Sequence, residues 1–511
     1  MIFVRSLQLL IMLIIGLEVF AEEVKVQERL SLNGSIRQAL KKNPDMISER
    51  INIEVSKNQL TKEKGEFAWG LETISRYEDR DKPQNTREFI AVGGISFPGN
   101  SARIFSDKNF IAKEGLKKKF QTGTSFEISS TFNRLENTLN KTSASSLYSP
   151  EYESFTGLTL IQPILKGFGR EANRAQIDIA QNRVEATQYL AEIKAINLIA
   201  ETASRYTDVI SIEEILKIRQ ENIELAESLL EKNKELLASE KGVQIDVTTA
   251  ELAVFQRKDD FIGSTATKVE RLNKLFELID LPPANDGAVE FKPLGQFFNG
   301  DNISSKENLT ELALEKRTDL HYFDKLIRSS ELNVIRAKDD ARSLLNLSGS
   351  YGAYGLSDNG TDAYTESFNR QGMEWSVGLN FKMILDKKAR NAGLQVARNQ
   401  LMKAKIEKQK AVKSIVLEID TAYERFESSK QRLTTANKAM ELAKERLEQE
   451  QALIDKGVGD VYRLVEQQQM LGSAQIRAVE ARGLLSKSII SLWISSGQVF
   501  DRLGIDRQLV K

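Results

Sequence analysis

The sequence contains no cysteine and only one histidine, His321. These scarcities exclude thiolate metal sites, disulfide frameworks, CxxC redox motifs and paired-histidine metalloprotease motifs, and a Ser-His-Asp triad would depend on His321. Positive and negative side chains balance at 72 each, so no net basic field is present to hold nucleic acid. We therefore expect a protein that is not an enzyme, binds no nucleic acid and uses no metal or cofactor.

Proline is scarce as well. Only 8 prolines occur in 511 residues, and none lies in 164–281 or 294–511. Both stretches therefore permit long helices, because proline breaks a helix interior. The segment 282–304 differs, since Pro282 and Pro283 stand there near several glycine, asparagine and aspartate residues, and it is predicted to be a linker.

The N-terminal segment has the pattern of a secretion signal. Arg5 precedes an apolar run from Leu7 to Leu17, and Ala21 stands in front of two glutamates. The run is shorter than the ~18–20 apolar residues that a spanning helix needs. We interpret 1–21 as a signal peptide cleaved after Ala21, and no later stretch has the pattern of a transmembrane helix.

The two halves of the remaining chain are related. When the sequence is shifted along itself, one shift aligns Lys42 with Lys316, and a second shift aligns Tyr206 with Tyr423. Each identity is weak alone, but their shared order indicates an internal duplication. The predicted repeats cover 22–281 (short helices, strands at about 69–161, a helical hairpin at about 170–281) and 305–511 (short helices, strands at about 344–383, a helical hairpin at about 390–496, a C-terminal tail).

Alternation of apolar and polar residues predicts strands. It is clearest from Phe120 to Phe132 and from Trp375 to Met383. The pattern fits a soluble antiparallel sheet, which it favours when taken alone, or a membrane sheet with one face toward lipid. Six candidates are fewer than the ~8 strands of the smallest membrane barrels, so a barrel would need several chains. The candidates lie near 69–77, 89–97, 120–132, 155–161, 344–354 and 373–383.

The helical stretches carry a coiled-coil pattern. Residues spaced three and four apart form an apolar seam interrupted by Asn233, and the second half repeats this spacing from Leu433 to Ile454. A compact globule cannot bury such long rods, so a supercoil or other copies must cover their seams. The seam residues of the first half are Ile223, Ala226, Leu230, Asn233 and Leu237, and the predicted helices cover about 170–237, 246–279, 390–455 and 460–496.

Taken together, these features resemble the TolC-like outer membrane efflux proteins, the outer membrane factors of tripartite export systems. The resemblance implies a mainly α-helical chain with membrane β-structure: a homotrimer in outer membrane lipid, with four strands per chain in a twelve-stranded β-barrel. A periplasmic α-helical coiled-coil tunnel continues this barrel. The resemblance rests on the signal peptide, on Ala39-Leu40-Lys41-Lys42-Asn43-Pro44-Asp45, on Gln162-Pro163-Ile164-Leu165-Lys166-Gly167-Phe168-Gly169-Arg170, and on a glycine at each hairpin tip.

The expected four strands are those near 69–77, 155–161, 344–354 and 373–383. The segment 89–132 is then additional, and it would form either an enlarged outward-facing hairpin or extra barrel strands.

The resemblance also implies a function. The chain would be a passive duct in the cell outer membrane, extending into the periplasm, to which an inner membrane pump and a periplasmic adaptor supply energy. Tight turns between helices favour glycine and a capping aspartate whatever their partner, so the tips could also be purely structural. The residues expected at the adaptor-facing rim are Gly242, Val243, Gln244, Ile245, Asp246, Val247, Gly457, Val458, Gly459, Asp460 and Val461.

Similar proteins carry inward-facing acids on the helix after the second tip. Glu466 matches one such position, whereas Arg463 stands where another acid is common. We expect a threefold ring of Glu466 at the pore entrance, partly neutralised by Arg463 about one turn away. An ordinary surface pair on a helix would explain the same two residues.

Two other classes of protein are considered. A secreted periplasmic coiled-coil scaffold with small soluble sheets would need the same helices, whereas a stand-alone porin would need many strands in one chain. No motif identifies the exported substrate or the class of pump.

Overall fold

The computed structural model describes residues 26–28, 31–83, 104–142, 147–284, 289–291, 293–295, 297–300, 303–369, 372–456 and 458–510. The predicted signal peptide, the candidate strand near 89–97 and Gly457 lie outside these residues. The chain divides into two compact units, a first of Met1–Ile53, Thr187–Tyr322 and Lys408–Lys511 and a second of Glu54–Ala186 and Phe323–Glu407. Each unit takes segments from both halves of the sequence, and the internal duplication stays a prediction.

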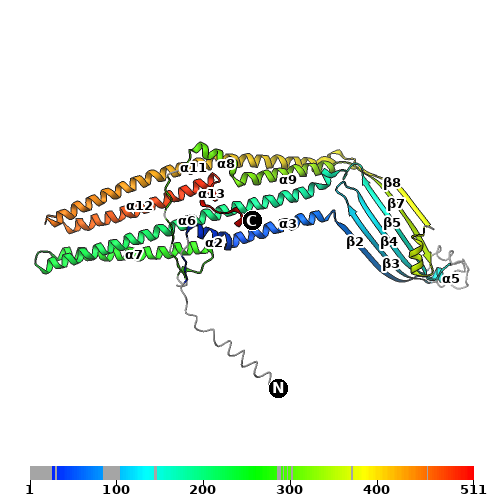
Figure 1. The fold of residues 1–511 in the computed structure, drawn as a ribbon, viewed down its shortest axis with the longest axis horizontal. Helices are drawn as coiled ribbons and strands as arrows, with labels where there is room; N and C mark the ends of the chain where they lie inside the picture. Colours follow the sequence, from blue (N-terminus) through cyan, green and yellow to red (C-terminus); the bar gives the residue numbers. More distant parts are fainter. Residues whose placement is uncertain are drawn as a thin grey trace, which may run out of the picture. The chain divides into compact units, whose positions relative to one another are not determined.

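Long helical hairpins are the main elements of the fold (Figure 1). Helix α6 (Arg170–Ala238) is followed by α7 (Gln244–Ile279), and α11 (Lys387–Asp455) is followed by α12 (Val461–Ser495). The two predicted helical hairpins are therefore confirmed. None of the helices in the described ranges is both long and apolar enough to cross a membrane.

Shorter helices precede each hairpin. Helix α3 (Pro44–Gly65) begins at a proline, and the Asn43 side chain caps it by accepting a hydrogen bond from the Asp45 backbone N–H at 3.0 Å. Helix α2 (Leu32–Lys42) also precedes the first hairpin, α8 (Lys306–Lys316) and α9 (Thr318–Asp340) precede the second, and α13 (Val499–Leu503) and the 3-10 helix η2 (Arg507–Leu509) follow it.

The first unit packs α12 closely against α6. A side chain at Gly472 would stand 2.5 Å from the amide nitrogen of the Asn222 side chain on α6, so a larger residue would have to displace that amide. Ion pairs join the same two helices, with Lys487 Nζ at 2.7 Å from Asp208 Oδ1 and a second pair between Glu214 and Arg482. Because these contacts connect the two hairpins, they fix the register of one against the other.

The predicted seam residues of α6 lie in this packing. Ile223, Ala226 and Asn233 are buried. The polar member, Asn233, donates from its amide nitrogen to the Leu229 carbonyl at 2.8 Å, so its own helix satisfies it.

A small parallel sheet was not predicted. It pairs β1 (Val26–Glu28) with β6 (Val289–Phe291), which lies inside the predicted linker. The Tyr206 hydroxyl of α6 donates to the nearby Leu294 carbonyl at 3.0 Å. Burial raises the pKa of Tyr206 to about 12. The linker is thus held against the helices of the first unit.

The second unit contains a six-stranded antiparallel sheet with the order β2-β3-β4-β5-β7-β8. All four expected strands are present. The described part of the additional segment forms two further strands of the same sheet. The strands are β2 (Trp69–Pro83), β3 (Ile104–Lys119), β4 (Ser125–Asn137), β5 (Glu151–Pro163), β7 (Leu344–Ser357) and β8 (Gly372–Lys382).

One predicted strand begins too early. The candidate from Phe120 to Phe132 enters the sheet only at Ser125, because the chain turns before that residue. The Phe120 N–H bonds to the Thr124 carbonyl at 2.8 Å, and Gly123 adopts a positive φ of 95°. Such a turn favours glycine, and it interrupts an alternation that looks continuous in the sequence.

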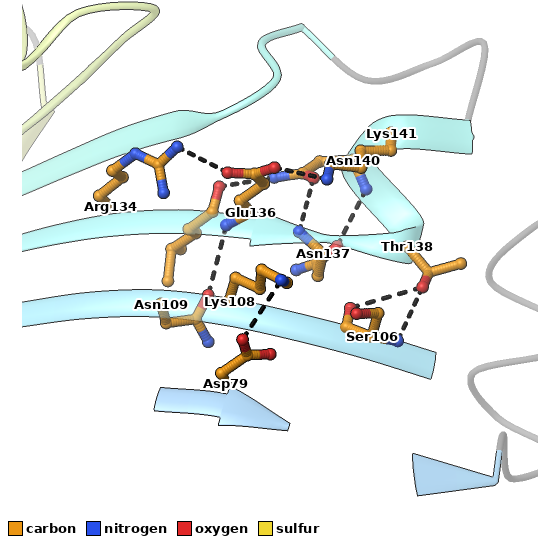
Figure 2. Close-up of polar contacts among 11 residues, drawn as sticks. Asp79, Ser106, Lys108, Asn109, Arg134, Glu136, Asn137, Thr138, Asn140 and Lys141 are labelled. Carbon is orange, nitrogen blue, oxygen red and sulfur yellow. Dashed lines mark hydrogen bonds and ion pairs between the residues drawn. The ribbon is translucent and has the colours of Figure 1, made fainter. Parts of the chain in front are cut away.

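The far ends of β3 and β4 are tied to each other and to β2 by polar contacts (Figure 2). Glu136 accepts from Arg134 at 2.6 Å and pairs with Lys141 of α5 (Thr138–Thr142). Lys108 of β3 pairs with Asp79 of β2 at 3.2 Å. These contacts hold the two additional strands in place at their ends.

A short helix, α10 (Gly360–Glu366), covers part of one sheet face. The Ser154 hydroxyl of β5 donates to the Ala363 carbonyl at 2.6 Å, and Thr156 lies 3.3 Å from Ser367 through their hydroxyls. A side chain at Gly355 would collide with the Ala363 carbonyl. Helix α10 thus covers polar side chains on a face that is otherwise largely apolar.

Candidate functional site at the hairpin tips

The first tip is a tight turn between α6 and α7. The Leu236 carbonyl accepts from the Lys241 and Gly242 backbone N–H groups, at 2.9 and 3.1 Å. A side chain at Gly242 would stand 3.0 Å from the Leu237 nitrogen and 3.1 Å from the Leu236 Cβ. A larger residue at position 242 would therefore fit only tightly, and Glu240 carries the left-handed backbone with φ 58°.

The second tip joins α11 to α12. The Val458 N–H bonds to the Leu453 carbonyl at 3.1 Å. A side chain at Gly459 would stand 2.6 Å from the Ile454 backbone nitrogen, a contact that rigid backbone cannot relieve. Asp460 caps α12, since its carboxylate accepts from the Tyr462 N–H at 2.9 Å. Asp460 is therefore a structural capping residue, the role that the sequence analysis considered for the aspartate of each tip.

Asp246 does not have that role. The N-cap of α7 is Val243, which makes no side-chain cap bond, and Asp246 lies in the first turn of the helix. Burial and the nearby charge of Asp460 both raise the pKa of the Asp246 carboxyl. The two tip aspartates therefore repel each other when both are ionised.

The two tips pack together through an apolar cluster. Leu229 of α6, Ala250 of α7 and Leu464 of α12 are buried in it. Val461 belongs to the same cluster, and Val247 is also buried. These two valines were expected at the adaptor-facing rim, but they hold the tips together and do not face solvent.

Other rim residues are open to solvent. The exposed fractions are 56% for Val243, 70% for Ile245 and 74% for Val458. Tyr462, which the sequence analysis did not select, is 65% exposed beside them. Gln244 and Asp460 are exposed as well, Gly242 and Gly459 are half-buried, and Gly457 lies outside the described residues. Each tip thus presents apolar side chains that nothing in the described chain covers.

An ion pair joins α6 to α11 near the tips. Lys232 Nζ lies 3.2 Å from Asp455 Oδ1. Hydrogen bonds from Lys232 and then Gln451 lower the pKa of the Asp455 carboxyl. The tips therefore combine one attractive contact between hairpins with the repulsion between Asp246 and Asp460.

Within one chain, Arg463 and Glu466 form no ion pair, and the threefold ring expected at the pore entrance stays a prediction. Arg463 and Glu466 are both exposed on α12, and the described ion pairs include none between them. Glu466 instead lines a groove of about 540 Å³ between α7 and α12, together with Asp259 and Asp260. Arg463 therefore leaves the Glu466 charge unpaired within the chain.

The same groove contains a buried arginine that the sequence analysis missed. Arg257 of α7 is only 4% exposed and donates to the Asn222 carbonyl at 3.0 Å. Burial lowers the pKa of its guanidinium, while the charge of Asp260 opposes that shift. No sequence signal could have found it, because an arginine in a polar helix is ordinarily exposed.

The single histidine is not part of any such site. The His321 ring lies 5.7 Å from the Tyr189 ring in a tilted arrangement. Among the described residues, no group of three or more histidine, aspartate or glutamate side chains is placed to hold a metal ion.

Comparison with known proteins agrees with this architecture. Residues 309–498 match the family model described as outer membrane efflux protein. No curated protein sequence matches the chain.

Three solved structures share the fold across nearly the whole chain. The CmeC outer membrane channel of Campylobacter jejuni has 16% identity and a TM-score of 0.62, and the match covers 92% of this chain and 86% of that one. The outer-membrane channel OprN has 16% identity and a TM-score of 0.64, covering 94% and 96%. The MtrE outer membrane channel of Neisseria gonorrhoeae has 17% identity and a TM-score of 0.60, covering 93% and 90%.

Proposed function

Because residues 309–498 match the outer membrane efflux protein family model and the chain shares its fold with outer membrane channels, we propose that it is a non-enzymatic channel of this family and that three copies assemble into one exit duct. In this proposal the sheets insert in outer membrane lipid and the helices line a periplasmic tunnel. A periplasmic adaptor docks at the tips, and an inner membrane pump supplies the energy. Residues 1–21 are removed on export, and 22–281 and 305–511 act as two repeats joined by 282–304.

One observation supports the duct over a secreted scaffold. The strands carry large apolar side chains that stay exposed on one face of the sheet, such as Leu71 at 75% and Trp375 at 73%. A soluble sheet would cover them, whereas lipid is the solvent in which such a face is stable.

Fractionation tests this proposal directly. The protein should require detergent for extraction from outer membranes, and the solubilised particle should have the mass of three chains. Recovery as a water-soluble monomer in the periplasmic fraction would favour the scaffold and refute the duct.

The exposed tip residues support adaptor docking. Ile245 and Val458 project apolar side chains from the two turns, and buried apolar anchors are what protein interfaces use. A photo-crosslinking amino acid at Ile245 or Val458 should capture a periplasmic adaptor in cells. The same residue at Lys57 of α3, an exposed position away from the tips, is the control. Equal capture from Lys57 and from the tips would refute tip docking.

A further inference from the structure

The two additional strands, β3 and β4, continue the pattern of the other four. Direct register partners form one row across the whole sheet, and every member of this row is a large apolar residue that is exposed by 36% to 75%. The row consists of Leu71, Leu116, Ile128, Leu158, Tyr351 and Trp375. We call the face that carries it the apolar face.

The neighbouring row points to the opposite face and contains no apolar side chain. Lys117 of β3 pairs there with Glu127 of β4 at 3.6 Å, and Ser350 contacts Ser376 at 2.8 Å through their hydroxyls. This row consists of Gly70, Lys117, Glu127, Thr159, Ser350 and Ser376. Alternation across all six strands is the pattern of a membrane wall with lipid on one side and water on the other.

Strand length agrees with this placement. A tilted strand needs ~9–11 residues to cross a bilayer. The additional strands have 16 residues in β3 and 13 in β4, and the shortest strand of the sheet, β8, has 11. Each of the six is long enough to span.

The edges of the sheet also fit closure. In the described sheet, β2 and β8 are the outer strands, and five successive antiparallel pairings make β8 antiparallel to β2. A further copy can therefore pair its β2 with β8 and keep every neighbour antiparallel. An odd number of strands per chain would not permit this.

We propose that β3 and β4 are part of the barrel wall, so that three copies close a barrel of eighteen strands in place of twelve. The inference rests on the trimer of the proposed function. Barrel diameter grows roughly in proportion to strand number, so this barrel is about 1.5-fold wider than a twelve-stranded one. Barrels of this strand number enclose an aqueous channel.

Disulfide mapping tests the wall, because the chain has no cysteine of its own. Opposite residues on adjacent antiparallel strands have Cα atoms ~4.5–5.5 Å apart, within disulfide range. The variants Leu71→Cys/Leu116→Cys and Ile128→Cys/Leu158→Cys should therefore crosslink within one chain in the outer membrane. Leu71→Cys/Leu158→Cys is the matched control, since three strand spacings place these residues about 14 Å apart.

The control variant Leu71→Cys/Leu158→Cys distinguishes a barrel of eighteen strands from one of twelve. If β3 and β4 left the wall, β2 would pair directly with β5, the control would crosslink, and the proposal would be overturned. The pairing between copies is tested separately. Val377→Cys in β8 is combined with Trp69→Cys, Leu71→Cys or Thr73→Cys in β2, and disulfides between neighbouring copies should give covalent trimers. Loss of these trimers with intact crosslinks within the chain would refute the trimer and not the six-stranded sheet.

Strand counting by electron microscopy covers the case in which a cysteine variant does not fold. The unmodified protein in a lipid disc should show eighteen strands, and twelve strands would overturn the proposal.

Discussion

At the scale of single residues, the tips depend on positions where no side chain fits. Gly459→Ala places a methyl group against the Ile454 backbone, 2.6 Å from its nitrogen. We expect a loss of about 1–3 kcal/mol in the free energy of unfolding, in the range of other overpacked sites. Thermal unfolding of the detergent-solubilised protein measures this loss.

Gly263→Ala of α7 is the matched control for that substitution. This helical glycine has no atom within 4 Å of the added methyl group. Alanine should therefore stabilise the helix by about 1 kcal/mol. Destabilisation by both substitutions, or by neither, would contradict the account of the second tip.

The orientation of the sheet can be tested at Glu114. This exposed residue of β3 points to the apolar face, between Thr73 and Ser130 in the register. If that face meets lipid, Glu114→Leu should stabilise the folded protein in bilayers by about 1–2 kcal/mol, since a carboxylate is disfavoured there. Glu127→Leu on the opposite face is the control and should give no such gain. Equal effects of the two substitutions would argue against a lipid-facing side.

The entrance charge is a second residue-scale prediction. Glu466 has no cationic partner within the described chain, so a ring of three should attract cations to the groove that it lines. We expect Glu466→Gln to reduce the cation selectivity of the channel in single-channel recordings. Arg463→Gln should change the selectivity less or in the opposite direction, and unchanged selectivity in Glu466→Gln would exclude a ring of Glu466 at the pore entrance.

At the scale of elements, the contact between the two hairpins should depend on pH. The raised pKa of Asp246 means that the folded protein binds this proton more tightly than the unfolded chain. Its contribution is fully present below the ordinary carboxyl pKa and is lost as the pH rises through the raised value. The lowered pKa of Asp455 has the opposite consequence, and its contribution is lost as the pH falls through the lowered value.

The tips should consequently be most stable near the ordinary carboxyl pKa of about 4. Hydrogen exchange at the tips, corrected for the intrinsic pH dependence, should show rising protection as the pH falls from 7 toward that value. Asp246→Asn should flatten this rise, while Asp455→Asn should remove the decline at still lower pH. If protection at the tips still rises at low pH in Asp246→Asn, a titratable group other than Asp246 must cause the rise.

The same elements show what the sequence could predict. Apolar periodicity and the absence of proline predicted both hairpins, because those patterns are local properties of a helix. The burial of Val247, Val461 and Arg257 was not predictable, since it depends on how α7, α12 and α6 pack together. Likewise, alternation located β4 only approximately, missed β3, and could not place either strand in the same sheet as the others.

At the scale of the whole molecule, the account is that a single chain supplies only an open sheet and long hairpins with exposed tips. Among the residues that the structure describes, neither edge strand of the sheet, β2 or β8, has a further partner strand. Closure by three copies explains the unpaired edges and the exposed apolar face together.

Ion conductance of the purified protein in planar bilayers tests this claim most directly. The account predicts discrete, long-lived conductance steps from a particle with the mass of three chains. A preparation that inserts into bilayers without conducting, or that does not insert at all, would contradict it.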